Sequence, residues 1–445
     1  MKTTPLPRLR ALLALALAAA PGAVPVAGAE RPGPKPGEAG GAGLALRSRK
    51  VLTAALEGPQ VIDHGRVLVK DGRIEAVGPA SATPVPEGYV EIDVGEAWLM
   101  PGMIDLHCHI AAGNVLFKND INDMVYLTNP GLRACAGVVP NNHLMRRGVG
   151  GGVTTVLFIP GSGTNMGGQG VLLKIGLERY EESELRNPGS LKLAQAGNPE
   201  RWTIGVGRSF MNWNTRNTFK RGIAYAKRWE AFEQGSGEEP EKDLELEIFR
   251  ALYGKEAQVS THTQMYQVVL MTITMVAQEL GLDAFIDHGS FDGYRTAALA
   301  QAAGVQAILG PRMIASTFPG FIDTDGKIIG MAAAYQERGH RVIGFNTDCI
   351  DEGVFVTPPQ EELSLQAGMS VRYGLENTNL ESVRGLTINP AIAAGIEDRV
   401  GSLEPGKDAD VLVISGDPGD PRTRVERVYT DGRVVYDSAT ERRRW

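Results

Sequence analysis

The middle of the chain, from about Leu99 to Val400, alternates short apolar runs with longer segments of helical periodicity. Stretches such as Met271–Leu280 and Ala297–Ala303 have the spacing of amphipathic helices. The eight expected strands are Met103–Ile110, Thr154–Pro160, Val171–Ile175, Leu191–Ala194, Val259–Thr263, Ala284–His288, Ala307–Leu309 and Val342–Phe345. Strands that alternate with helices in this way predict an α/β fold, a (β/α)8 TIM-like barrel. A doubly wound open sheet is the alternative, and it would require a nucleotide-binding fingerprint after an early strand.

The two ends of the sequence share a different pattern, in which short β-rich runs flank turn residues. Asp71-Gly72 separates two such runs near the N-terminus, and Asp431-Gly432 does the same near the C-terminus. Asp-Gly between such runs is a strong hairpin signal. The runs are Arg66–Lys70, Arg73–Gly78, Ala409–Ser415, Val425–Thr430 and Arg433–Tyr436. We therefore expect one small, discontinuous β-sandwich domain built from both chain ends.

The first 29 residues have the three parts of a secretory signal peptide. Lys2, Arg8 and Arg10 precede the apolar run Ala11–Ala20. Ala27-Gly28-Ala29 then has the small-x-small form that signal peptidase cleaves. The apolar run is shorter than the roughly 20 residues that a membrane-spanning helix needs, so we expect cleavage rather than an anchor. The mature protein would be periplasmic or secreted, without a membrane span.

These patterns divide the chain into five parts. Residues 31–43 are rich in Pro and Gly and carry few apolar side chains, which is typical of a flexible segment. The expected parts are the signal peptide at 1–29, a flexible leader at 30–43, the N-terminal part of the β-sandwich domain at 44–98, the barrel at 99–400, and the C-terminal part of the β-sandwich domain at 401–441.

Composition narrows the classes of function. The 445 residues carry a formal net charge of −7 and show no Lys/Arg cluster, so we expect no nucleic-acid partner. Cys108, Cys135 and Cys349 lie far apart, which excludes a disulfide framework and a cysteine metal site. The glycine-rich stretches Gly148–Gly152 and Gly161–Gly170 lack a phosphate-binding motif. They are expected to form turns, and some of these glycines are candidates to line a substrate mouth.

The first expected strand of the barrel ends in Asp105-Leu106-His107-Cys108-His109. Because alternate side chains of a strand share a face, His107 and His109 point the same way as Asp105. Leu106 and Cys108 then point the other way. Two imidazoles on one face indicate a metal site. The alternative is a pair of core histidines that bond to backbone carbonyls.

Three more candidate ligands end later strands. His262 and His288 lie at the carboxyl ends of the fifth and sixth expected strands, and Asp348 follows the eighth. Strand parity places Asp348 on the inward face. The carboxyl ends of the strands form the rim that carries the chemistry in TIM-barrel enzymes. These three residues are therefore predicted to share one site with His107 and His109.

In these features the sequence resembles the metal-dependent amidohydrolase superfamily. The hallmarks are an apolar Pro-Gly segment before His-x-His, which is Leu99–Asp105 here, single histidines that end strands five and six, and an aspartate that ends strand eight. A further match, Leu386–Ala391 followed by Gly401–Asp410, resembles the return from the barrel to the β-domain. The resemblance extends over about Leu44–Tyr436 and is nearest to the imidazolonepropionase-like and dipeptidase-like branch.

The resemblance also implies a fourth-strand residue that bridges two metal ions, often a lysine carboxylated on its amine. Residues 191–199 are similar to a Leu-Lys-Met-Ala-Leu-Gly-Glu-Asn-Pro motif of a related branch. Lys192 is retained, but Gly197 stands where that motif has Glu. This departure either favours Lys192 as the bridge or leaves a single metal ion. Lys174 is the competing lysine.

The activity implied by the resemblance is hydrolysis of an amide-type C–N bond, linear or cyclic, by a metal-activated hydroxide. The implied metal ligands are His107, His109, Lys192, His262, His288 and Asp348. Asp348 would also be catalytic, moving a proton to the leaving nitrogen. One or two zinc ions suit imidazole and carboxylate ligands, with manganese, iron and cobalt as alternatives.

The expected substrate is a small molecule such as a dipeptide, an N-acyl amino acid or a lactam. The loops expected to contact it are 161–170, the helical insertion 214–254, and 311–318. Two other functions stay open, deamination of an aminated ring and a non-catalytic binding role on the same scaffold. Deamination is disfavoured because the residues after His262, Thr263-Gln264-Met265-Tyr266, lack the glutamate of deaminase branches. The oligomeric state stays open, with a homo-oligomer among the options.

Overall fold

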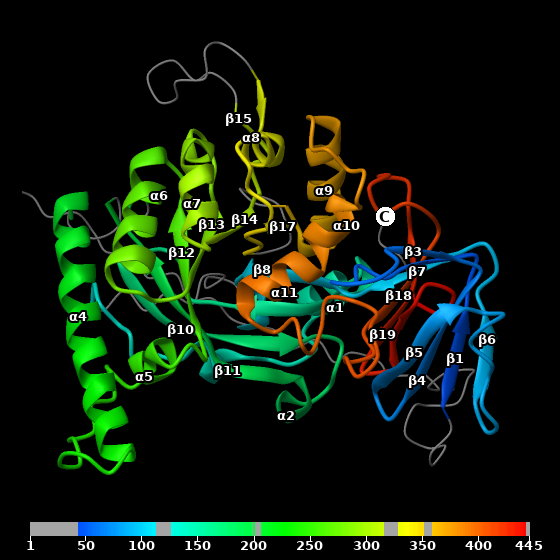
Figure 1. Ribbon diagram of the computed structural model, residues 1–445, viewed down its shortest axis with the longest axis horizontal. Coiled ribbons are helices and arrows are strands. Elements are labelled where there is room, and N and C mark those ends of the chain that lie inside the picture. The colour runs from blue at the N-terminus through cyan, green and yellow to red at the C-terminus, as the bar shows by residue number, and fades with distance from the viewer. Residues whose placement is uncertain are drawn as a thin grey trace, which may run out of the picture. The chain divides into compact units, whose positions relative to one another are not determined.

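The computed structural model describes residues 43–112, 126–197, 199–200, 206–315, 328–350 and 358–441 (Figure 1). The expected signal peptide and the expected leader up to residue 42 lie outside these ranges. Among the described residues, no helix is both long and apolar enough to cross a membrane. The strands within these ranges form an eight-stranded, a six-stranded and a four-stranded sheet and a two-stranded ribbon.

The eight-stranded sheet is the barrel. Its strands in spatial order are β8 (Met103–Cys108), β9 (Val153–Phe158), β10 (Met166–Lys174), β11 (Glu184–Ala194), β12 (Gln258–Thr263), β13 (Ala284–His288), β14 (Gln306–Leu309) and β17 (Ile343–Phe345). All eight expected strands are present, although β10 and β11 begin several residues earlier than expected. A bridge between Cys108 and Cys349 joins the first strand to the segment after the last, and the His109 N–H donates to the Cys349 carbonyl at 2.8 Å. The predicted barrel is confirmed.

One strand of the barrel runs against the others. β10 pairs antiparallel with both β9 and β11, whereas the other neighbouring strands are parallel. A parallel connection needs a crossover of roughly a dozen residues or more, and the segment 159–165 is too short for one. The stretch 161–170, expected to form turns, is buried throughout, and its second half belongs to β10. The expectation of regular strand–helix alternation is therefore wrong at β10.

Helices pack around the remaining strands of the barrel (Figure 1). They are α1 (His143–Gly150), α6 (Tyr266–Thr272), α7 (Ala297–Ala302), α8 (Met331–Glu337), α9 (Leu363–Arg372), α10 (Glu381–Leu386) and α11 (Ile388–Ala394). The expected helix Met271–Leu280 begins within α6 and continues as the π-helix η3 (Ile273–Glu279). Shorter elements are η1 (Ile110–Ala112), η2 (Ala134–Gly137), α2 (Tyr180–Ser183), η4 (Gly293–Thr296), η5 (Gln360–Glu362) and the ribbon of β15 (Ile314–Ala315) and β16 (Ile329–Gly330).

The expected insertion between the fourth and fifth strands is a helical hairpin. Its long helix α4 (Arg208–Glu233) packs against α5 (Ile248–Tyr253). Phe219 and Phe249 meet edge to face, with their ring centroids 5.2 Å apart. Gly222 is required here, because a Cβ at this position would lie 2.1 Å from the Phe249 ring. The close approach of the two helices therefore depends on one residue without a side chain.

The two remaining sheets form the expected β-sandwich. The strand orders are β5–β4–β1–β6 and β20–β19–β18–β7–β2–β3. The bounds are β1 (Leu44–Arg47), β2 (Lys50–Leu52), β3 (Val61–Asp63), β4 (Gly65–Lys70), β5 (Arg73–Pro79), β6 (Val90–Asp93), β7 (Trp98–Pro101), β18 (Val411–Ile414), β19 (Val425–Thr430) and β20 (Arg433–Asp437). β18 pairs with β7, so the two chain ends share one sheet. β7 spans the expected boundary at residues 98 and 99.

Both expected hairpins are present in the sandwich. Asp71, Gly72, Asp431 and Gly432 all have positive φ, as a type I′ turn requires at its two central positions. One apolar cluster contains residues of both sheets, among them Leu46 of β1 and Tyr429 of β19. The predicted construction from both chain ends is therefore confirmed by strand pairing and by the shared core.

A buried ion cluster joins the barrel to the sandwich. Lys174, the last residue of β10, contacts the carboxylates of Asp408 at 2.6 Å, Asp410 at 3.2 Å, and Asp431. Burial opposes the charge of Lys174, but the three carboxylates outweigh this effect and raise the pKa of its ammonium. Lys174 is in register with Thr155, near the start of β9, because β10 runs in reverse. It therefore lies at the end of the barrel opposite the strand-end histidines.

Replacement of Lys174 by Met is expected to lower the free energy of unfolding by about 3–5 kcal/mol, because Asp410 loses its cation while remaining buried. Chemical denaturation at neutral pH measures the change. The matched control is Lys220→Met, since Lys220 pairs with Glu279 at 3.3 Å with 58% of its side chain exposed. For Lys220→Met we expect the free energy of unfolding to fall by at most about 1 kcal/mol. Equal losses in the two variants would contradict a structural role for the cluster.

Candidate metal centre

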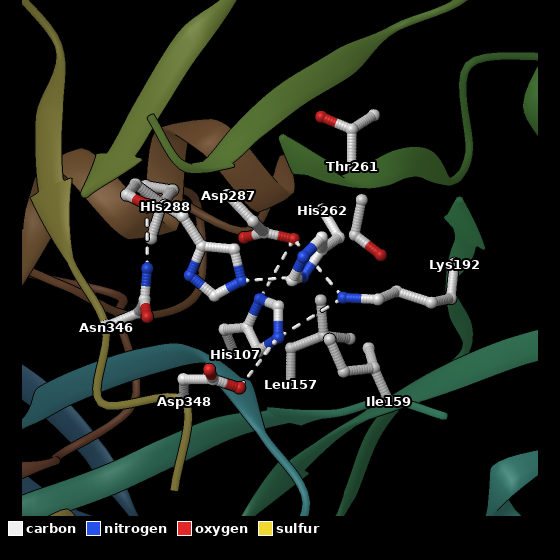
Figure 2. A network of polar contacts seen from close by, with 12 residues as sticks. His107, Leu157, Ile159, Lys192, Thr261, His262, Asp287, His288, Asn346 and Asp348 are labelled. Atoms are coloured by element: carbon white, nitrogen blue, oxygen red, sulfur yellow. Dashed lines mark hydrogen bonds and ion pairs between the residues drawn. The ribbon is translucent and has the colours of Figure 1, made fainter. Parts of the chain in front are cut away.

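All six predicted ligands come together at the carboxyl end of the barrel strands, and Figure 2 shows His107, Lys192, His262, His288 and Asp348. His107 lies in β8 and His109 directly follows it, Lys192 lies in β11, His262 in β12, His288 ends β13, and Asp348 follows β17. The four imidazoles are between 0% and 7% exposed. The His288 ring centroid lies 4.5 Å from those of both His107 and His262. The strand ends thus bring residues that are far apart in sequence into one buried cluster.

The candidate ligand atoms form two overlapping groups. In the first, the Nε2 atoms of His107 and His109 lie 3.3 and 3.4 Å from Oδ1 of Asp348. In the second, His107 joins His262 and His288, and Nε2 of His288 lies 2.9 Å from Nδ1 of His262. The ligand atoms of each group lie within 4.8 Å of one another. Both groups therefore offer a divalent ion the nitrogen and oxygen ligands that zinc prefers.

Backbone carbonyls fix the tautomers of two histidines. Nδ1 of His109 lies 2.9 Å from the carbonyl oxygen of Ile159, and Nδ1 of His288 lies 2.8 Å from that of Gly310. A carbonyl oxygen only accepts hydrogen bonds, so each Nδ1 carries the hydrogen and each Nε2 keeps its lone pair. Both Nε2 atoms face the cluster, which is the usual arrangement of metal-binding histidines. The residues present therefore fit a divalent metal.

Two of the predicted ligands have a left-handed backbone. φ is 70° at His288 and 50° at Asp348, a region that costs a non-glycine residue about 1–3 kcal/mol. At His288 this turn breaks the alternation of the strand, so that Asp287 and His288 both face the cluster (Figure 2). Strand parity predicts that these neighbours point apart. Sequence reasoning therefore missed Asp287, whose signal is its place directly before a strand-end histidine.

The structure separates the two candidate lysines. Nζ of Lys192 lies 3.2 Å from Nε2 of His107, and its side chain is fully buried. Lys174 lies in the ion cluster at the other end of β10. Gly197 borders the histidines, because a Cβ there would lie 3.8 Å from Nε2 of His262. Of the two lysines, Lys192 is the one next to the predicted ligands.

Asp105 supports the cluster from behind. Its carboxylate accepts hydrogen bonds from the backbone N–H of His107 at 3.2 Å and from the side-chain amide of Gln360 at 3.3 Å. It also accepts from the N–H and the hydroxyl of Thr347, the neighbour of Asp348. These bonds tie the first strand to the segment after the last. Ser162, from the buried glycine-rich stretch, contributes a hydroxyl 2.9 Å from Nδ1 of His262.

Burial and mutual contact shift the pKa values in the cluster. Burial lowers the pKa of His288 to about 3 and that of His262 well below its ordinary value. Burial opposes the charge of Asp348, but the neighbouring imidazoles of His107 and His109 hold the pKa of that carboxyl well below its usual range. At neutral pH the two imidazoles are therefore neutral and Asp348 is ionised. These are the protonation states that a metal requires of its ligands.

Comparison with solved structures decides the family. An amidohydrolase from Thermotoga maritima MSB8 is 30% identical, with a TM-score of 0.75 over 88% of this chain and 100% of that one. The chain belongs to the amidohydrolase family. The sequence profile of this family matches residues 324–436. The expected superfamily is thus confirmed, and the protein is a hydrolase that acts on a C–N bond of a small molecule.

Curated relatives place this amidohydrolase in the imidazolonepropionase-like branch. The imidazolonepropionase of Sphingopyxis alaskensis is 25% identical over 403 residues, which cover 85% of this chain and 93% of that protein. The amidohydrolase tasK of Hapsidospora irregularis is 26% identical over 412 residues, or 84% of this chain. This chain spans 40% of the length of tasK. The similarity to both proteins therefore includes the barrel strands that carry the cluster.

The metal-free protein is expected to lose stability as the pH falls, because His262 and His288 are harder to protonate when folded. In the unfolded chain a histidine has a pKa near 6.5. Between that pH and the lower pKa of the folded state, the unfolded chain binds more protons than the folded protein, so the free energy of unfolding decreases as the pH falls. His288→Gln should reduce the slope of unfolding free energy against pH by up to about 1.4 kcal/mol per pH unit. Denaturation of chelator-treated protein between about pH 5 and 7.5 measures both slopes. Identical slopes would rule out this contribution of His288.

Proposed function

We propose that this amidohydrolase cleaves an amide-type C–N bond, linear or cyclic, at a divalent metal centre. The observation that carries the proposal is the convergence of four buried imidazoles and one ionised carboxylate at the rim of the barrel. Two of the imidazoles are held by backbone carbonyls with their lone pairs toward the cluster. Metal binding requires several side chains to be deprotonated and oriented toward one position, whereas the packing of a core does not.

The two groups of ligand atoms support a centre of two ions. His107, His109 and Asp348 would hold one ion, and His262 and His288 the other. Zinc suits these ligands, with manganese, iron and cobalt as alternatives, because imidazole and carboxylate bind all four. The overlap of the groups at His107 keeps the two proposed positions close to each other.

Lys192 is the proposed bridge between the ions. Addition of carbon dioxide to its neutral amine forms an N–C bond, releases one proton and leaves a carbamate with two oxygen ligands. The position of Nζ, 3.2 Å from Nε2 of His107, supports this role. A centre with one ion and an unmodified lysine is the competing arrangement, and the number of ions bound per chain distinguishes the two.

Asp348 is the proposed proton carrier. When bound, the metal would supply water activated at neutral pH and polarisation of the scissile carbonyl. Asp348 is ionised and 21% of its side chain is exposed, so it can reach a substrate at the rim. It would accept the proton of the attacking water and donate it to the leaving nitrogen, returning to a carboxylate. Its Oδ1 lies 3.3 and 3.4 Å from the Nε2 atoms of His107 and His109, so one ion could bind all three side chains.

A cyclic amide is the favoured substrate class. Several curated relatives are imidazolonepropionases, named for a substrate whose ring contains an amide-type C–N bond. Dipeptides, N-acyl amino acids and lactams belong in the same screen. Deamination stays disfavoured, since Thr263-Gln264-Met265-Tyr266 after His262 offers no glutamate. A non-catalytic binding role is disfavoured because the described residues include two groups of side chains that could hold a metal ion.

We also propose export to the periplasm or the medium, from the signal-like residues 1–29. Expression of the full chain in a bacterium with a periplasm should yield a protein whose first residue is Glu30. N-terminal sequencing of the purified protein checks this. Ala29→Phe should block cleavage, because signal peptidase requires a small residue before the cut. An unprocessed N-terminus in the wild type would count against export.

Metal analysis followed by a substrate screen tests the proposed activity. We expect one or two divalent ions per chain, and hydrolysis of at least one compound among dipeptides, N-acyl amino acids, lactams and cyclic ureas. Asp348→Asn should lower kcat by about 10²–10⁴-fold, because the proton carrier is lost. The metal content of the variant must be measured alongside, to separate proton transfer from metal loss. Absence of bound or activating metal would refute the metal centre. Unchanged hydrolysis by metal-loaded Asp348→Asn would refute the role of Asp348 as proton carrier.

A further inference from the structure

Asp287 is a buried carboxylate that the mechanism above does not use. It lies in β13 directly before His288 and is 0% exposed. Among the described residues, neither of its oxygens has an aligned hydrogen bond, and the same holds for Nδ1 of His107. The two groups face each other, with Oδ2 of Asp287 3.2 Å from Nδ1 of His107. A buried carboxylate in this state costs free energy, so its presence requires an explanation.

The backbone conformation of the next residue, His288, directs Asp287 toward the cluster. The left-handed conformation of His288, with φ of 70°, lets two consecutive residues face the same side. Figure 2 shows the Asp287 carboxylate beside the rings of His107, His262 and His288. Its Oδ2 is also 4.0 Å from Nζ of Lys192. One carboxylate therefore contacts two of the predicted ligands, and its neighbour in sequence is a third.

His107 occupies the central position among the ligands. It is the member shared by both groups of ligand atoms, so its orientation affects any ion bound in either group. His109 and His288 have their Nδ1 atoms held by neutral carbonyls. At His107 the corresponding position is occupied by the Asp287 carboxylate, and a charged acceptor binds an N–H roughly twice as strongly as a neutral one.

We propose that Asp287 is a positioning residue for the metal centre, and this rests on the proposed function. Asp287 accepts the Nδ1 hydrogen of His107 and thereby directs the Nε2 lone pair of that imidazole toward the metal. A carboxylate behind a ligating histidine fixes the ring and makes it a stronger ligand. Asp287 also adds a negative charge next to the ions without occupying a coordination position.

The test is the affinity of Asp287→Asn for zinc, measured by competition with a chelator. We expect an affinity about 10–100-fold weaker than that of the wild type. The metal-free variant should unfold at about the same denaturant concentration as the wild type, because asparagine keeps the volume of Asp287 and its side-chain oxygen still accepts the Nδ1 hydrogen of His107. A merely structural role would instead lower the stability of the metal-free protein. The visible spectrum of the cobalt-loaded variant should also change, since one ligand is reoriented.

Asp292→Asn is the matched control. Asp292 lies in the loop after β13 and accepts a hydrogen bond from the Tyr266 N–H at 2.8 Å, outside both ligand groups. Its zinc affinity and cobalt spectrum should equal those of the wild type. Asp287→Ser serves as a second variant should Asp287→Asn fail to fold, with at least the same loss of affinity expected.

Two outcomes would overturn the proposal, and they are distinguishable. Wild-type zinc affinity in Asp287→Asn, with an unchanged cobalt spectrum, would refute the role of Asp287 and leave the proposed hydrolase intact. A wild-type protein that binds neither zinc nor cobalt would refute the metal centre itself, and the role of Asp287 with it.

Discussion

Burying ionisable groups next to one another is the constraint on which the structure of this protein depends. Four imidazoles, two carboxylates and a lysine meet at the rim of the barrel, and all of them except Asp348 are buried. Such a cluster is costly unless its groups are paired or bind a metal. The surrounding chain is arranged to orient them, through carbonyls behind His109 and His288, the Asp105 network behind His107, and left-handed residues at His288 and Asp348.

The same constraint acts at the other end of the barrel. Lys174 and three aspartates of the sandwich form a second buried ion cluster, which holds the two parts of the fold together. The two clusters differ in charge balance. Lys174 has its carboxylates at contact distance, whereas two imidazoles of the rim have lone pairs directed at other candidate metal ligands, His109 toward Asp348 and His288 toward His262. The cluster around Lys174 already contains its cation, whereas the cluster at the rim is suited to bind one.

The reversed strand β10 decides which lysine belongs to which cluster. Its last residue, Lys174, lies beside the start of β9, far along the barrel axis from the strand ends that carry the histidines. In β11, which is parallel to β12, Lys192 is in register with Ser260, two residues before His262. Strand direction therefore separates two buried lysines that are both plausible bridges by sequence. Reversal also directs the glycine-rich turn toward the rim, where Ser162 meets His262.

The sequence by itself determined the eight barrel strands, the two Asp-Gly hairpins and the five strand-end residues that are predicted to be ligands. These features depend on local rules, namely apolar periodicity, turn chemistry and alternation along a strand. The tertiary structure alone decided the reversal of β10, the position of Lys192 rather than Lys174 beside the predicted ligands, and the presence of Asp287 at the cluster. The reversal depends on which strands pair, and pairing is a contact between distant segments. Asp287 reaches the cluster because a left-handed residue at His288 overrides alternation, and no pattern of side chains encodes that turn.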